Sequence, residues 1–111
     1  MSNDEIFELL GYVVASEYRT NILKSIGKGI KIPSVIAGDI GLRTNHVSNV
    51  LRDLKEHNLV LCLNEDARKG RLYKNTELGL EILKYLWFSI LLKIYYTKSL
   101  KIFIFKIISA Y

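Results

Sequence analysis

Residues 32–60 constrain the fold most, because they carry two apolar stripes at helical spacing on either side of Gly41. Pro33 suits the first turn of a short helix, where its missing N–H breaks no hydrogen bond, and we expect this helix over residues 33–40. A longer helix is predicted over residues 44–57. The expected buried sides are Val35, Ile36 and Ile40 in the first helix and Val47, Val50, Leu51 and Leu54 in the second. Two helices joined by so short a turn predict a helix-turn-helix.

Apolar residues at helical spacing also precede this pair. Ser2 and Glu5 have the spacing of a capping box, in which each side chain bonds to the other residue's backbone N–H. The stripe behind them consists of Ile6, Leu9, Leu10, Val13, Val14, Tyr18, Ile22, Leu23 and Ile26. The segment GKG, residues 27–29, is expected to end it, because glycine adopts the left-handed conformation that a helix stop requires. The pattern fits one bent helix or two separate ones.

A β-hairpin is predicted directly after the longer helix. Asn58 suits the left-handed end of that helix, residues 59–63 form an apolar strand, 64–70 a loop and 71–75 a returning strand. Thr76 is the expected cap of a last helix. The apolar stripe of that helix is Leu78, Ile82, Leu83 and Leu86. The predicted fold class is therefore mostly α with a small β-hairpin.

Charge is distributed unevenly along the 111 residues, which have a formal net charge of +5. Residues 1–42 hold four basic and five acidic side chains, whereas residues 43–75 hold seven basic and four acidic ones. The positive excess begins with the longer helix. This distribution predicts an anionic partner, such as the phosphate backbone of nucleic acid.

The residue types that an enzyme or a metal site needs are sparse. Cys62 is the only cysteine, which excludes an internal disulfide and a thiolate cluster, and within an apolar strand we expect it to be a buried, unreactive thiol. His46 and His57 lie eleven residues apart on one predicted helix and cannot share a metal ion. We therefore predict no enzymatic activity, no cofactor and no metal. A lone thiol and an acidic N-terminus without a secretory signal predict a cytoplasmic protein.

The outer surface of the longer helix is short and polar near its start. A DNA major groove accepts one α-helix, and Asn, Arg and Ser side chains hydrogen-bond to base edges or phosphates there. Asn45 and Asn49 suit adenine, and Arg52 suits either guanine or a phosphate. The N–H groups near Ser34 suit a phosphate. Tyr73 is expected to be a packing residue.

Three segments in this order resemble the winged-helix transcriptional regulators of archaea, within the ArsR-type and MarR-type folds: SEYRTNILKSI, then IPSVIAGDIGLRTNHVSNVLRDLKEHNLV, then GRLYKNTELGLEIL. The resemblance covers roughly residues 7–86. It implies a winged helix-turn-helix DNA-binding domain over residues 1–80, with a recognition helix at about 44–57 in the major groove. It also implies a wing at about 64–71 on the DNA backbone or minor groove.

The resemblance also carries over a set of DNA contacts. The implied recognition-helix contacts are Arg43, Thr44, Asn45, His46, Ser48, Asn49 and Arg52, and the implied wing contacts are Arg68, Lys69 and Arg71. Together with Ser34 these are the predicted DNA-binding residues of a repressor or activator. Many ArsR-type relatives sense metals through paired cysteines, and this chain lacks such a pair.

The C-terminal helical extension, residues 81–111, departs from the family pattern. Residues 86–111 contain four lysines and no acidic residue, and they are otherwise mostly apolar and aromatic. We expect this surface to join two copies of the chain in a homodimer, with a membrane-surface helix as the alternative. A transmembrane helix is disfavoured because the lysines interrupt every apolar run. A protein-interaction module with an acidic partner is the alternative to DNA binding.

Overall fold

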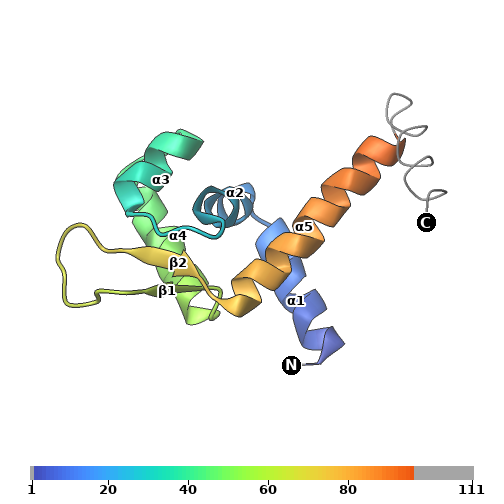
Figure 1. Ribbon diagram of the computed structural model, residues 1–111, viewed down its shortest axis with the longest axis horizontal. Helices are drawn as coiled ribbons and strands as arrows, with labels where there is room; N and C mark the ends of the chain where they lie inside the picture. Colours follow the sequence, from blue (N-terminus) through green and yellow to red (C-terminus); the bar gives the residue numbers. More distant parts are fainter. Residues whose placement is uncertain (1, 97–111) are drawn as a thin grey trace.

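The computed structural model describes residues 2–96, which form a winged helix-turn-helix fold with a two-stranded antiparallel sheet (Figure 1). In chain order the elements are α1 (Asn3–Val14), α2 (Glu17–Ile26), α3 (Pro33–Ile40), α4 (Thr44–Glu56), β1 (Val60–Cys62), β2 (Tyr73–Asn75) and α5 (Glu77–Tyr96). The predicted fold class is confirmed. The predictions for residues 97–111 lie outside the described residues.

The first apolar stripe belongs to two helices, which answers the question that the sequence left open. The Ser2 side chain accepts a hydrogen bond from the backbone N–H of Glu5 at 3.3 Å, as the capping pattern predicts. Ser16 caps α2 in the same way through the N–H of Arg19, at 3.4 Å. The chain therefore changes direction at residues 15–16, where a second N-cap begins a new helix.

Two residues of the predicted apolar stripe are wrongly assigned to the core. Val14 and Tyr18 are exposed, whereas Val13 and Ile22 are fully buried. Tyr18 follows the break, where the helical phase restarts and turns its side chain away from the core. Val14 precedes the break and lies one position beyond the buried Val13, on the outer side of α1.

The helix-turn-helix consists of α3 and α4, and Gly41 lies at its turn with a left-handed φ of +72°. The prediction extended this helix to His57, but α4 ends at Glu56. His57 is its C-cap. Asn58 follows with a φ of +60°, the left-handed conformation expected of it. Val35 was predicted to be on the buried side of α3, which is wrong because the residue is 46% exposed. α3 has only two turns and packs against α2 and α4 with its other side.

The hairpin strands are shorter than predicted: residues 59, 63, 71 and 72 were predicted as strand ends and lie outside the paired register. That register joins Val60 to Asn75, Leu61 to Lys74 and Cys62 to Tyr73. On its other side Tyr73 exchanges two backbone hydrogen bonds with Lys31, at 2.9 and 3.0 Å. A single bridging residue has no sequence period, so this third partner of the sheet was not predicted.

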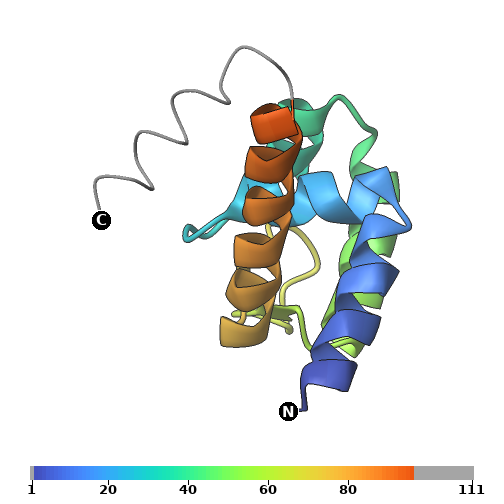
Figure 2. The same cartoon turned by 90° about the vertical axis from the view of Figure 1, so that its right-hand side faces the viewer.

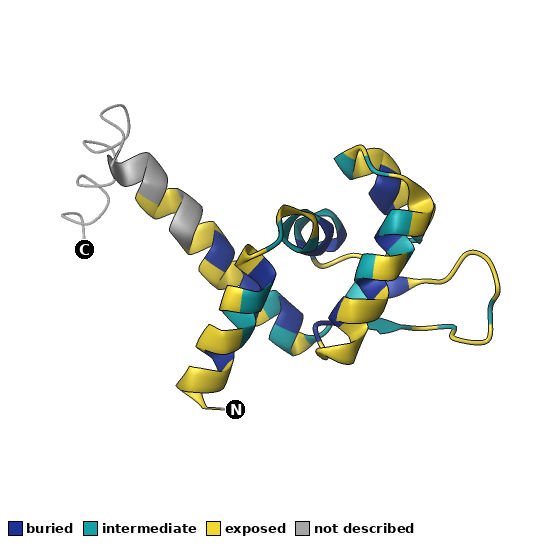
Figure 3. Ribbon diagram, turned by 180° about the vertical axis from the view of Figure 1, so that it is seen from behind, coloured by how far each residue is buried: buried dark blue, intermediate teal, exposed yellow. Residues whose placement is uncertain are grey.

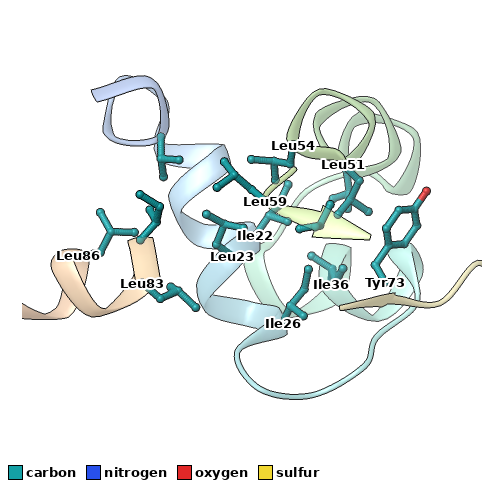
Figure 4. Close-up of a cluster of buried hydrophobic side chains, with 14 of the residues drawn as sticks. Ile22, Leu23, Ile26, Ile36, Leu51, Leu54, Leu59, Tyr73, Leu83 and Leu86 are labelled. Atoms are coloured by element: carbon teal, nitrogen blue, oxygen red, sulfur yellow. The ribbon is translucent and has the colours of Figure 1, made fainter. Parts of the chain in front are cut away.

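The hydrophobic core lies where α2, α4, the hairpin and the start of α5 meet (Figure 4). Leu51 and Leu54 of α4 face Ile22 and Leu23 of α2, and all four are fully buried. The prediction that the Cys62 thiol is buried is wrong. The residue is half-buried, with its Sγ 3.6 Å from the side-chain oxygen of Asn64.

The start of α5 is packed in the core, and its later turns leave the core (Figure 3). Ile82, Leu83 and Leu86 are buried as predicted, whereas Trp87 and Phe88 are 53% and 61% exposed. α1 lies beside this helix (Figure 2). The ring centroids of Phe7 and Tyr85 are 6.3 Å apart. Among the described residues no helix meets the length and hydropathy that a membrane crossing requires.

A polar junction joins the hairpin to three helices. The backbone N–H of Thr76 donates to the Leu59 carbonyl at 3.1 Å, and its hydroxyl donates to the Asn58 carbonyl at 2.6 Å. The same hydroxyl accepts the N–H of Gly79 at 3.0 Å, which confirms the predicted cap of α5. The buried amide of Asn75 donates to two carbonyls at the end of α2, those of Leu23 at 3.1 Å and Gly27 at 2.8 Å.

Gly79→Ala is expected to destabilise the fold by about 3 kcal/mol, because the new methyl group would overlap the carbonyl oxygen of Leu59. Gly11→Ala is the matched control, since a methyl group there meets no atom within 4 Å in the interior of α1. It should stabilise the protein by roughly 0.5–1 kcal/mol. Urea unfolding followed by circular dichroism measures both, and equal free energies of unfolding would contradict the close approach at residue 79.

Candidate nucleic-acid interface

A cleft of about 500 Å³ lies between the start of α3, one face of α4 and the hairpin loop. Ile32, Pro33 and Tyr73 are among the residues that line it. The polar side chains that line it are Ser34, Thr44, Ser48, Arg52, Lys55, Arg68, Lys69 and Arg71. Seven of the eleven predicted DNA-binding residues therefore lie around one concave surface. The cleft that these eight polar residues line is called the basic cleft.

One face of α4 forms the longest wall of the basic cleft. Thr44, Ser48, Arg52 and Lys55 follow one another at intervals of four, four and three residues, which aligns them along one side of a helix. Lys55 was not among the predicted contacts. The same periodicity that located the buried stripe would have found it, since it lies three residues beyond Arg52.

The face of α4 turned away from the core divides into a neutral half and an acidic half. Asn45 and Asn49 occupy its first two turns, and Asp53 and Glu56 occupy its last two. All four are exposed. Because carboxylates repel phosphates, only the N-terminal half of this face suits a close approach of DNA.

Three of the predicted contacts on α4 already have partners within the protein. The side-chain oxygen of Asn49 accepts a hydrogen bond from the Arg52 guanidinium at 3.1 Å, which holds both side chains on the outer surface. The side-chain oxygen of Asn45 accepts the backbone N–H of His46 at 2.9 Å. Arg43 is the exposed N-cap residue of α4, and its carbonyl accepts the N–H of Val47.

His46 lies away from the basic cleft. Its ring is half-buried and meets the ring of Tyr18 edge-on, with centroids 4.7 Å apart. This contact joins the start of α4 to α2. The structure thus places His46 at a packing contact between helices, on a different side of α4 from Arg52.

The hairpin loop has internal hydrogen bonds that hold its shape. Asn64 closes its base by accepting the backbone N–H of Leu72 at 2.7 Å and donating to the carbonyl of Gly70 at 3.2 Å. Arg71 donates from Nε to the Ala67 carbonyl at 2.8 Å. Gly70 has a left-handed φ of +65°, which explains a glycine at this position. The loop therefore presents Arg68 and Lys69 on an ordered backbone.

The loop is also held to α4 by an ion pair between Lys55 and Glu65. The hydrogen bond from Lys55 lowers the pKa of the Glu65 carboxyl, and the same contact raises the pKa of Lys55. Both groups are therefore charged at neutral pH. A second ion pair, Lys31 with Asp39 at 2.7 Å, joins the chain before α3 to the end of α3. Ser25 donates to the same carboxylate at 2.9 Å, and these two bonds lower the pKa of Asp39.

Tyr73 is buried, as predicted for a packing residue, and it also lines the basic cleft. Figure 4 shows its hydroxyl pointing away from the core cluster. Within residues 2–96 there is no group of three His, Cys, Asp or Glu side chains that could hold a metal ion.

Comparisons with known proteins find a likeness in structure alone. No protein-family model and no curated protein matches the sequence. The homodimeric winged helix-turn-helix DNA-binding domain of a possible ArsR-family transcriptional regulator from Mycobacterium bovis has a TM-score of 0.66 at 17% identity. The match covers 88% of this chain and 94% of that one.

Two further structures show the same likeness. A mutant of the type III plasmid segregation protein TubR has a TM-score of 0.64 at 14% identity, over 78% of this chain and 93% of that one. MepR of S. aureus, in complex with DNA, has a TM-score of 0.63 at 17% identity, over 96% and 89%. At these identities the likeness establishes the winged helix-turn-helix fold.

Asn64→Ala is expected to loosen the hairpin loop while leaving the core intact, because it removes two hydrogen bonds that close the loop. The amide of Leu72 should exchange with solvent about tenfold faster, as the loss of roughly 1.4 kcal/mol of local stability implies. The amide of Tyr73, which bonds to Lys31, should be unaffected. Hydrogen exchange measured by NMR tests this, with Asp66→Ala as the control, and unchanged exchange at Leu72 would contradict it.

Proposed function

We propose that this protein is a DNA-binding transcriptional regulator without enzymatic activity, which acts in the cytoplasm as a homodimer. The observation that carries the proposal is the basic cleft, which brings hydroxyl groups of α3 and α4 together with three cationic side chains of the hairpin loop. Hydroxyl and guanidinium groups around one groove suit a phosphate backbone. We also propose that the protein is related to the winged-helix regulators of archaea that its sequence resembles.

The two parts of the interface have different tasks in this proposal. The N-terminal half of α4 enters the major groove, where Asn45 and Asn49 face the base edges. Ser34 and the α3 N-terminus contact the phosphate backbone, together with Arg43, Thr44, Ser48 and Arg52. Arg68, Lys69 and Arg71 of the wing contact the backbone or minor groove. His46 supports α4 through its ring contact with Tyr18.

Two of the similar structures add support. The Mycobacterium bovis protein is described as a homodimeric DNA-binding domain, and the S. aureus protein is in complex with DNA. We infer a DNA-binding unit over residues 1–80 and a dimerisation segment over residues 81–111. Binding at a promoter would either occlude it or recruit other proteins to it.

The exposed apolar side chains of α5 support the homodimer. Tyr85, Phe88 and Leu92 recur at intervals of three and four residues, and Trp87 and Leu91 lie beside them. Phe7 of α1, which is 59% exposed, extends this surface across the neighbouring helix. Apolar surface of this extent favours a partner that covers it, and a second copy offers the same surface.

Asn49→Ala and Arg68→Ala are expected to weaken DNA binding in different ways. Asn49→Ala should cost roughly 1–3 kcal/mol on the preferred duplex and reduce the preference for that sequence. Arg68→Ala should weaken binding to all duplexes alike and lower the salt slope by about one. Fluorescence anisotropy over a salt series, with the duplex upstream of the protein's own gene and a scrambled duplex, measures both.

Equal losses on the two duplexes for Asn49→Ala would contradict a base contact at this residue. Absence of duplex binding by the unaltered protein, even at low salt, would overturn the proposed function and favour a module that binds an acidic protein.

Phe88→Lys is expected to weaken the homodimer at least thirtyfold, because it places a charge in an apolar interface and truncates an aromatic contact, a loss of about 2 kcal/mol or more. Sedimentation equilibrium measures the dissociation constant. Ile30→Lys is the control, since Ile30 is 53% exposed in the loop between α2 and α3, outside this surface. An unchanged dimer in the Phe88 variant would place the interface elsewhere.

A further inference from the structure

The ion pair between Lys55 and Glu65 lies at the edge of the basic cleft. Lys55 is in the last turn of α4 and lines the cleft, whereas Glu65 is near the start of the hairpin loop and is not among the lining residues. Both side chains are substantially exposed, so water and ions reach the pair. The charge that Lys55 offers to the cleft therefore depends on whether Glu65 holds it.

Lys55 differs from the other cations of the basic cleft in its partner. Arg52 bonds to the neutral amide of Asn49, and Arg71 bonds to a backbone carbonyl, so both retain their full charge. Among the described residues, Lys55 is the cation of the cleft that forms an ion pair with a carboxylate. A cation paired in this way attracts a phosphate only weakly, because the pair has no net charge.

Turning Lys55 from Glu65 to a phosphate would gain little. The separated Glu65 carboxylate would remain near the bound phosphate, beside the second carboxylate of Asp66, and would repel it. The attraction between Lys55 and the phosphate would be opposed by the repulsion between the phosphate and the unpaired Glu65 carboxylate.

We propose that Glu65 masks Lys55 from the DNA backbone, so that the protein makes one phosphate contact fewer than the cations of its cleft allow. The inference rests on the proposed function and identifies Glu65 as a residue that limits affinity at the same site. Its physical basis is that an intramolecular carboxylate occupies the place of a phosphate. The ion pair also holds the hairpin loop against α4. The loop therefore keeps its position while the attraction of the protein for DNA of any sequence is reduced.

The chain offers a matched control for this proposal. Asp66 is the next residue, is exposed in the same loop, and forms no ion pair within the described part of the chain. Glu65→Gln and Asp66→Asn therefore change the net charge equally, but only the first releases Lys55. Any difference between the two variants reports the release of Lys55.

The test measures binding of full-length protein to duplex DNA by fluorescence anisotropy across a salt series. Glu65→Gln should steepen the slope of log K against log salt by about 0.9 relative to Asp66→Asn, the value for one further phosphate contact. Its affinity at low salt should rise about tenfold above that of the control. The double variant Lys55→Gln/Glu65→Gln should lose this gain. Equal slopes for the two single variants would overturn the proposal.

Elution from heparin in a salt gradient separates this inference from the proposed function, because heparin is an anion without base sequence. If the unaltered protein binds no duplex, the proposed function fails, and the heparin measurement still tests the masking of Lys55. Glu65→Gln should elute at higher salt than Asp66→Asn, and the double variant should not. Identical elution of the two single variants would overturn the proposal independently of any result with DNA.

Discussion

Hydrogen bonds around the Leu59 carbonyl join the hairpin to the end of α4 and the start of α5. The chain leaves α4 at this point, forms the hairpin and returns to the same carbonyl through the N–H of Thr76. The amide of Asn75 joins the returning strand to the end of α2, and Gly79 lets α5 approach without a side chain in between. These contacts fix where the hairpin leaves the body, and the position of the wing relative to α4 follows from them.

The electrostatics of the interface depend on the same arrangement. Because the hairpin emerges next to the last turn of α4, Glu65 reaches Lys55, and the basic residues of the loop lie across the cleft from Arg52. The acidic residues at the end of α4, Asp53 and Glu56, remain on the outer face. One helix thus presents hydroxyl and cationic groups to the cleft, neutral amides at its start and carboxylates at its end, which gives a bound anion a preferred position.

Much of the fold could be predicted from local patterns. The caps at Ser2 and Thr76, the glycine turn at Gly41 and the apolar stripe of α4 each depend on residues within a few positions of one another, and each was found as expected. The failures have a common cause. The exposure of Val35 depends on which side of a short helix meets its neighbours, and the bridge between Lys31 and Tyr73 joins segments far apart in the chain.

The order of the elements and the candidate residues of the site follow from the sequence, because helical periodicity, capping and charge are local properties. The grouping of those candidates depends on the tertiary fold. It brought Ser34, Ser48 and Arg68 around one cleft, turned His46 toward Tyr18 and paired Lys55 with Glu65. These outcomes depend on how elements pack against one another across the core, and contacts of that kind leave no period in the sequence.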